Sequence, residues 1–466
     1  MTATANRLLL KIDALRLGMF VQLDLGWMNH PFPRSRFKLD DPAQIATLRQ
    51  LGVLEVLVRP DLSDPVAFAD SAHDAGHVAA AEPAPSGDTA AAIPTPAAAT
   101  AAADSSPLRR RMLEPCSQRE PLRAGDPTLA MRRAQLGRER DSLARSERLH
   151  AQASRAWLGI TRDAVNNPTG AHHAALLLAD GLVDELLGDD DTTIRVLSEA
   201  AGTAASQHAL NVTVLSLLLG RSLGLDEATM QTLALGALLH DIGKLLLPDH
   251  LRNADASNGA LLLRERREHV AQGARLGLAM GLQAAALQVI SQHHEQHDGS
   301  GLPLGLAGNA IAMPARVVAL VDTYDRLCNP MAGQPLRTPH EAQALLFAHM
   351  RKQLDPAVLA AFIKLLGVYP PGSVVQLNDE RLALVVAVHP QRPLKPSVVV
   401  HDPRVPRDEA LIVHLQQEPG LGIRRSLHPQ HLPRAVVDYL SPRERVSYYF
   451  AHGLEPAVTA THGQAA

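Results

Sequence analysis

The stretch MQTLALGALLHDIGK, residues 230–244, predicts the centre of the fold. Its apolar residues recur at helical spacing as far as Leu239, and the ionisable pair His240 and Asp241 follows directly. Burying an imidazole and a carboxylate is costly unless something compensates their desolvation. A metal ion would compensate it, because imidazole and carboxylate are suitable ligands for Fe, Mn or Zn. The stretch therefore indicates a buried helix that ends at a metal site.

Helical periodicity extends from this stretch in both directions. Apolar residues keep helical spacing almost throughout residues 174–366, in segments such as VTVLSLLLGRSLG, HVAQGARLGLAM and ARVVALVDTYDRL. After residue 373 the period changes to that of strands, in VVQL, LALVVAV and PSVVVHD. Aromatic residues make up only 3% of the chain, so the core must rely on Leu, Val and Ala. We expect a mainly α fold, a helical bundle with a small C-terminal β appendage.

The first third of the chain has a different composition. Residues 1–70 alternate short apolar runs with turn residues, which is typical of a small α+β domain. Residues 71–126 are rich in Ala and Pro and poor in large apolar side chains, which predicts a disordered linker. Residues 127–170 carry leucines at heptad spacing among many charges, which favours a solvated connecting helix over a weak coiled coil.

Charge and cysteine content exclude several classes of protein. The formal net charge of -3 gives no global attraction to nucleic acid or to an acidic membrane, so we expect neither as a partner. No uncharged apolar run is long enough to insert into a membrane. Cys116 and Cys328 lie far apart and outside any CxxC spacing, which argues against a disulfide framework and favours a cytoplasmic location.

Seven side chains on five predicted segments could bind metal: His208, His240, Asp241, His269, His293, His294 and Asp322. A lone helical histidine is more often a surface or core residue than a ligand, and we assign a structural role to the pair His172 and His173. The seven supply nitrogen and carboxylate donors without cysteine, unlike a typical structural zinc site. Two metals held by such donors can lower the pKa of a water and stabilise oxyanions at phosphorus.

The order of these motifs resembles the HD-GYP family of bacterial cyclic di-GMP phosphodiesterases. The motifs are His208, HDIGK at 240–244, His269, HHEQHDGSGLP at 293–303 and VDTYDRL at 321–327. The resemblance implies an HD-type bundle in an HD-GYP-like domain at residues 171–400, followed by a C-terminal extension at 401–466. The N-terminal LKIDALRLGMFVQLDLGWMNHPFPRSRFKL is similar to a small uncharacterised domain often found before HD-GYP domains.

The resemblance also implies roles for single residues. It implies that the seven candidates bind two divalent metal ions, Fe or Mn, with Asp241 bridging them. Lys244 matches a lysine that contacts the substrate phosphate, so Asp241 and Lys244 are the expected catalytic residues. Ala204 stands where some members carry a glutamate for a third metal, so we expect two metals.

The sequence departs from the family pattern at two places near the expected substrate. Gly301, Leu302 and Pro303 replace the Gly-Tyr-Pro signature, so the tyrosine ring and hydroxyl are missing. Gln334 falls where an arginine is usual, which leaves Arg337 as the remaining positive charge. The expected substrate contacts are therefore Lys244, Gly301, Leu302, Pro303 and Arg337.

The function that the resemblance implies is hydrolysis of cyclic di-GMP to pGpG, or further to GMP, in bacterial second-messenger signalling. One alternative is a catalytically weak or inactive module that binds nucleotide or partner proteins. Another is an HD phosphohydrolase that acts on a nucleoside triphosphate or monophosphate. Partners other than cyclic di-GMP, whether a second copy of the chain or a signalling protein, stay open.

Overall fold

The computed structural model describes eleven ranges of the chain: 8–23, 36–50, 53–68, 127–188, 192–197, 201–252, 259–330, 334–389, 392–418, 420–442 and 445–451. The predicted linker at 71–126 lies outside these residues. The described residues divide into two compact units: one takes in residues 8–23, 36–50, 53–68 and 127–130, and the other begins at residue 131.

The N-terminal unit is a small α+β module, as expected from its sequence. It consists of β1 (Leu8–Lys11), β2 (Phe20–Gln22), β3 (Arg36–Lys38), α1 (Pro42–Gln50) and β4 (Glu55–Val58). The strands form an antiparallel sheet in the order β1-β4-β2-β3. Val21, Leu39, Leu48 and Val58 are buried and form the core of the module.

The second unit is mainly helical and confirms the predicted HD-type bundle. Its helices are α3 (Pro127–Asp163), α4 (Pro168–Leu187), α5 (Ala204–Ser222), α6 (Glu227–Leu239), α7 (Asp249–Arg252), α8 (Gly259–Met280), α9 (Ala284–Gln292), α10 (Met313–Cys328), α11 (Pro339–His349) and α12 (Pro356–Leu366), with α13 (Arg434–Leu440) near the C-terminus. A 3₁₀ helix, η6 (Ile242–Leu246), follows α6. None of the helices among the described residues has the length and apolarity needed to span a bilayer.

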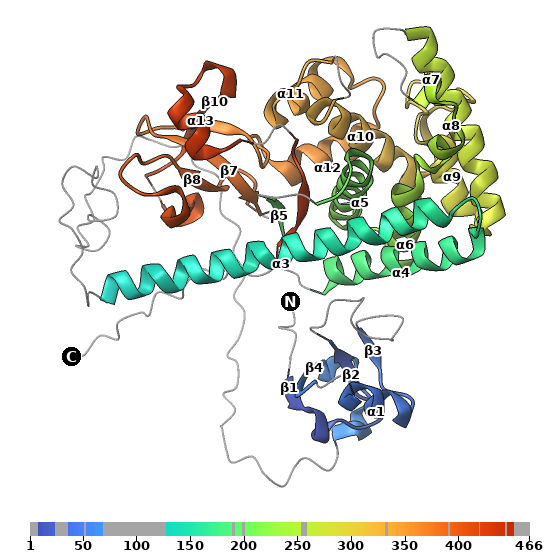
Figure 1. Cartoon of the computed structure of the whole chain (residues 1–466), viewed down its shortest axis with the longest axis horizontal. Helices are drawn as coiled ribbons and strands as arrows, with labels where there is room; N and C mark the ends of the chain where they lie inside the picture. Colours follow the sequence, from blue (N-terminus) through green and yellow to red (C-terminus); the bar gives the residue numbers. More distant parts are fainter. Residues whose placement is uncertain are drawn as a thin grey trace, which may run out of the picture. The chain divides into compact units, whose positions relative to one another are not determined.

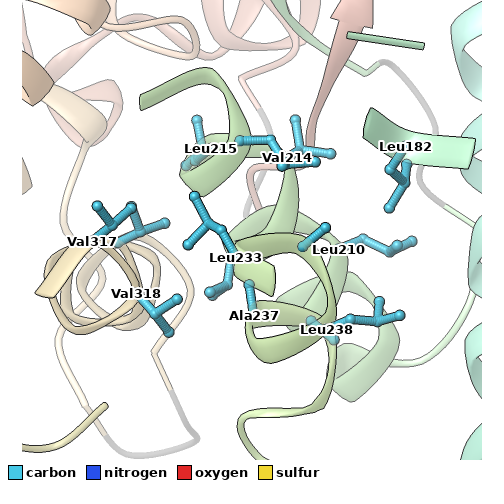
Figure 2. Packing of buried hydrophobic residues seen from close by; sticks show 14 of the residues in the cluster. Leu182, Leu210, Val214, Leu215, Leu233, Ala237, Leu238, Val317 and Val318 are labelled. Atoms are coloured by element: carbon cyan, nitrogen blue, oxygen red, sulfur yellow. The ribbon is translucent and has the colours of Figure 1, made fainter. Parts of the chain in front are cut away.

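Helix α6 lies at the centre of the bundle because it is apolar on all sides. It packs against α4, α5, α9 and α10. Figure 2 shows Leu233 and Ala237 of α6 between Val317 and Val318 of α10 and Leu210 of α5. The helix begins at the N-cap Asp226, whose side chain accepts a hydrogen bond from the backbone amide of Thr229. This buried helix carries His240 at its C-terminal end.

The predicted β appendage is a seven-stranded sheet. Its strands are β5 (Thr193–Val196), β6 (Val374–Leu377), β7 (Leu382–Val388), β8 (Ser397–Val400), β9 (Ile412–His414), β10 (Ile423–Leu427) and β11 (Tyr448–Ala451). The main order is β10-β6-β7-β5-β11, and β8 pairs with both β7 and β9. Strands β9, β10 and β11 come from the predicted C-terminal extension, so the sheet joins residues on both sides of the boundary expected at residue 400.

Helix α3 differs from the solvated helix that its charged sequence predicts. In Figure 1 it runs along both the sheet and the helical bundle. Ser146 Oγ donates to the carbonyl oxygen of Phe450 in β11 at 2.9 Å, and Trp157 Nε1 donates to that of Leu238 in α6 at 3.1 Å. Ala153, Trp157 and Ile160 are buried in the main core. Burial of the C-terminal half of α3 therefore overrides its polar composition, and the expectation of a fully solvated helix is wrong there.

Candidate metal centre

Helix packing brings together all seven of the predicted ligands, which come from distant parts of the sequence. His208 lies in α5, His269 in α8 and Asp322 in α10, whereas His240 and His293 are the C-terminal caps of α6 and α9. Helix α6 packs against α5, α9 and α10, and η6 packs against α8. The ends of these elements therefore converge on one centre.

The first ligand group consists of His208, His240 and Asp322, whose ligand atoms all lie within 4.8 Å of one another. His208 Nε2 lies 3.2 Å from His240 Nε2 and 3.1 Å from Asp322 Oδ1. His240 Nε2 lies 3.5 Å from the same carboxylate oxygen. Two imidazole nitrogens and one carboxylate oxygen facing a common point form a suitable donor set for a divalent cation.

The second ligand group consists of His269, His293 and His294, which meet the same 4.8 Å criterion. His269 Nε2 and His293 Nε2 are 3.3 Å apart. His294 Nε2 is buried and has no hydrogen-bond partner among the described residues. A buried polar atom without a partner is costly, so this nitrogen fits a metal ligand better than a core side chain.

Asp241 lies between the two groups and presents one carboxylate oxygen to each. Its Oδ2 lies 3.6 Å from His208 Nε2 and 3.5 Å from His240 Nε2. Its Oδ1 lies 3.4 Å from His269 Nε2 and 3.9 Å from His293 Nε2, and is also buried without a hydrogen-bond partner among the described residues. This is the arrangement that a carboxylate bridge between two ions requires, and the donor set fits a pair of metals.

The ring orientation of four histidines is held by hydrogen bonds to their other nitrogen. The Nδ1 atoms of His240, His269 and His293 lie 2.7 to 2.9 Å from the backbone oxygens of Ala237, Glu265 and Ile290. His208 Nδ1 lies 2.6 Å from Asp325 Oδ2. An acceptor at Nδ1 holds the proton there and leaves Nε2 free to bind metal.

Burial and neighbouring charges set the ionisation of the centre. Burial keeps the pKa values of His293 and His294 well below the usual range, so both rings are neutral and able to bind metal. Burial disfavours a charged His208, but hydrogen bonds to Asp322 and Asp325 outweigh it and raise its pKa to about 9. Metal binding at His208 would therefore displace a proton.

The two carboxylates of the centre stay ionised. Burial opposes the charge of Asp241 and Asp322, but nearby cations outweigh it and hold both pKa values well below the usual range. Lys244 is the largest of the causes that lower the pKa of Asp241, and Arg326 is the largest of those that lower the pKa of Asp322. Both carboxylates are thus in the form that binds a cation.

Asp325 is a functional candidate that the sequence analysis did not single out. It is fully buried, and its Oδ1 accepts hydrogen bonds from the side-chain amides of Asn211 at 2.8 Å and Asn329 at 2.9 Å. Its other oxygen orients His208. The signal in the sequence was its spacing, since Asp325 follows Asp322 by three residues and therefore lies on the same side of α10.

A cavity of about 670 Å³ opens onto the centre. Five of the seven candidates line it: His208, Asp241, His293, His294 and Asp322. Lys244, Glu265, Arg326 and Gln334 add polar groups, and Trp157, Leu251, Leu262 and Met350 add apolar surface. Its volume is in the range of small-molecule sites.

The Gly-Leu-Pro segment is not among the residues that line this cavity, and its contact with substrate stays a prediction. The carboxylate of Glu295 accepts hydrogen bonds from the backbone amides of Leu304 and Leu306, at 2.7 and 2.9 Å, which folds the loop onto its own start. The amide of Leu302 donates to the carbonyl oxygen of His294 at 3.0 Å. A Cβ at Gly301 would lie 2.1 Å from the backbone nitrogen of Gln296, so this glycine is needed for packing. The loop is therefore held against the backbone of the segment that carries the histidine pair.

Arg337 is also absent from the lining of the cavity. It is half-buried, and its backbone amide donates to the carbonyl oxygen of Leu327 at 3.3 Å. Arg326 and Arg445 line the cavity instead, although the sequence analysis did not select them. Positive charge around the cavity thus comes from Arg326, Arg445 and Lys244, together with Arg252 and Arg266.

Two family models match the chain. Residues 193–358 match the HD domain, and residues 8–175 match a domain of unknown function, DUF3391. The second match extends from the N-terminal module across the predicted linker and α3. The HD domain implies binding of divalent metal, in agreement with the two ligand groups.

A curated relative is similar to a larger part of the chain than either family model matches. Cyclic di-GMP phosphodiesterase PA4108 of Pseudomonas aeruginosa is 31% identical over 400 residues, which cover 84% of each chain. The cyclic di-GMP phosphodiesterase response regulator RpfG of Xanthomonas campestris is 30% identical over 149 residues, 32% of this chain and 39% of RpfG. The solved structure of Bd1817, an HDG"Y"P protein from Bdellovibrio bacteriovorus, covers 77% of this chain and 98% of its own at 15% identity, with a TM-score of 0.34, too distant to add to the assignment.

The fold, the two ligand groups and the family match define a protein of the HD superfamily of metal-dependent phosphohydrolases. Within this superfamily the chain belongs to the HD-GYP family of cyclic di-GMP phosphodiesterases. Gly301, Leu302 and Pro303 stand in place of the family's Gly-Tyr-Pro signature.

Proposed function

We propose that this protein is a phosphodiesterase that hydrolyses cyclic di-GMP to linear pGpG with two divalent metal ions. The observation that carries the proposal is the position of Asp241, which presents its two oxygens to two separate histidine groups beside a cavity. The relative PA4108, which matches over 84% of each chain, supports cyclic di-GMP as the substrate.

In this proposal His208, His240 and Asp322 hold one ion, His269, His293 and His294 hold the other, and Asp241 bridges them. Neutral imidazoles and carboxylates without thiolate suit Fe or Mn. When bound, two such ions supply Lewis acidity that activates water and stabilises negative charge on oxygens at phosphorus.

Lys244 is the side chain that we assign to the substrate phosphate. Its Nζ donates to Asp241 Oδ2 at 2.8 Å and lies 3.5 Å from Glu265 Oε1. The side chain is 24% exposed and lines the cavity, so these carboxylates hold the ammonium group at the wall where the substrate would bind. There it favours developing negative charge on a phosphoryl oxygen.

Hydrolysis can be tested directly with protein purified without air and supplied with Mn²⁺ or Fe²⁺. We expect chromatography to show loss of cyclic di-GMP and appearance of pGpG. After the metal is removed with a chelator, we expect no turnover. Further conversion to GMP would show a second cleavage. No product with either metal would contradict the enzyme assignment.

The same preparation separates the competing functions. Calorimetric binding of cyclic di-GMP without product would favour a non-catalytic nucleotide-binding or protein-interaction module. Hydrolysis of nucleoside triphosphates or monophosphates in preference to cyclic di-GMP would favour another HD phosphohydrolase. A signalling role is tested by deleting the protein in its host and measuring cyclic di-GMP, which we expect to rise.

Replacing Asp325 with asparagine is expected to weaken metal affinity by about 10 to 100-fold. The amide would keep the size of the side chain, but its NH₂ group would face either His208 or the amides of Asn211 and Asn329, all of which need an acceptor. A competing chelator measures the affinity. The control is Asp379→Asn, because Asp379 pairs with Arg381 at the surface. Unchanged affinity in Asp325→Asn would show that its bond to His208 has no role in metal binding.

A further inference from the structure

Arg326 is a cation inside the candidate centre to which the family motifs quoted above assign no role. It lies in α10 one turn after Asp322, its side chain is 27% exposed, and it lines the cavity. Because helical positions four residues apart share one face, Arg326 extends from the same side of α10 as Asp322.

Two of the three guanidinium nitrogens of Arg326 are held by the carboxylates of the centre. Nε donates to Asp322 Oδ1 at 2.8 Å and Oδ2 at 3.0 Å, and Nη2 donates to Asp241 Oδ2 at 3.1 Å. These hydrogen bonds use Nε and Nη2, and none among the described residues involves Nη1. The planar group is therefore fixed in orientation on one edge, and Nη1 stays available to a ligand in the cavity.

Arg252, Arg266 and Arg445 also line the cavity, but Arg326 and Lys244 are the lining cations with a hydrogen bond to Asp241. A guanidinium group with a fixed orientation suits a tetrahedral phosphoryl group, whose oxygens accept charge-assisted hydrogen bonds. Gln334, which lines the cavity where an arginine was expected, is neutral, and Arg337 does not reach the cavity. Lys244 contacts Asp241 as Arg326 does, but as a point charge rather than a planar fork.

We propose that Arg326 anchors a non-bridging oxygen of the substrate's phosphoryl group beside the two ligand groups, through the guanidinium edge that Asp322 and Asp241 leave free. The proposal rests on the proposed function, since it takes the cavity to be the substrate site. It assigns to α10 the positive charge that the loop at Gln334 lacks. The alternative role for Arg326 is to position Asp322 and Asp241 without contacting a ligand.

The test is calorimetric titration of inorganic phosphate into Mn²⁺-loaded protein, with metal content measured on the same samples. We expect phosphate to bind Arg326→Ala at least tenfold more weakly than wild type, about 1.4 kcal/mol, at unchanged metal content. Arg326→Lys keeps a positive charge beside the two carboxylates but loses the fork, and we expect a smaller defect of the same sign. The control is Arg275→Ala, which removes the same charge from the exposed face of α8 and should bind phosphate as wild type does.

Either of two results would overturn the proposal. One is wild-type phosphate affinity in Arg326→Ala at full metal content. The other is loss of metal from both Arg326 variants, because Arg326 would then only position the ligands. Cyclic di-GMP hydrolysis is assayed separately. If the protein binds phosphate through Arg326 but leaves cyclic di-GMP intact, the proposed function is contradicted and the role of Arg326 in phosphate binding still holds.

Discussion

Asp241→Ala is expected to lose at least one of the two metal ions and to hydrolyse cyclic di-GMP at least about a thousandfold more slowly, an increase of about 4 kcal/mol in the activation barrier. Asp241 is the one candidate whose two oxygens face both ligand groups, at 3.4 to 3.9 Å from four histidine nitrogens. Its removal also leaves Lys244 and Arg326 without the carboxylate that they share. Metal content and the rate of pGpG formation, measured on one preparation, test both parts.

The control for this substitution is Asp249→Ala. Asp249 lies in α7, eight residues after Asp241, and its side chain is 87% exposed. It carries the same charge outside the centre, so its loss should change neither metal content nor rate. An Asp241→Ala protein that keeps both metals and wild-type turnover would rule out the bridging role and the mechanism built on it.

The ligand set could be predicted because each ligand adjoins a strong helical pattern. His240 follows a continuous apolar run that forms the buried helix α6, and His293 follows the amphipathic helix α9. Burial, helical spacing and residue type are all visible in a single sequence, and together with the family motifs they select the same seven residues that the helices bring together.

The residues around the ligands were harder to predict because their roles depend on packing between distant elements. Asp325 and Arg326 occur in the quoted VDTYDRL motif, but only the approach of α5 and η6 to α10 gives them His208 and Asp241 as partners. The pairing of β5 with β11 joins segments about 250 residues apart, and no local pattern indicates it. The prediction that α3 is solvated was wrong for a similar reason, since the buried face of α3 depends on contacts with β11 and α6.

The Gly-Leu-Pro loop lies outside the residues that line the cavity. Its position after the histidine pair predicts contact with substrate, and that contact stays a prediction. Glu295 accepts two amide hydrogen bonds from the loop, and Gly301 packs on the backbone of residues 295–296. The loss of the family's tyrosine therefore leaves the ligand set and its support in place.

Gly243→Ala is expected to destabilise the protein by about 3 kcal/mol, which lowers Tm by roughly 6 to 12 °C. An added Cβ would lie 1.9 Å from the carbonyl oxygen of His269 and 2.3 Å from the backbone nitrogen of Gly273. Both neighbours are backbone atoms of α8, so a side-chain rotation cannot relieve the overlap, and η6 and α8 must move apart. Because α8 carries His269 and η6 follows Asp241, the same displacement should weaken metal binding at the second ligand group.

The matched control is Gly159→Ala in α3, because an added Cβ there meets nothing within 4 Å. Alanine is favoured over glycine inside a helix by about 0.5 to 1 kcal/mol, so this substitution should raise Tm slightly and leave metal content unchanged. Thermal unfolding of the two variants, with metal analysis, therefore compares the same substitution at two sites, where it is expected to change Tm in opposite directions. If Gly243→Ala unfolds at the wild-type temperature with both metals bound, then close packing of η6 on α8 is not what holds Asp241 and His269 together.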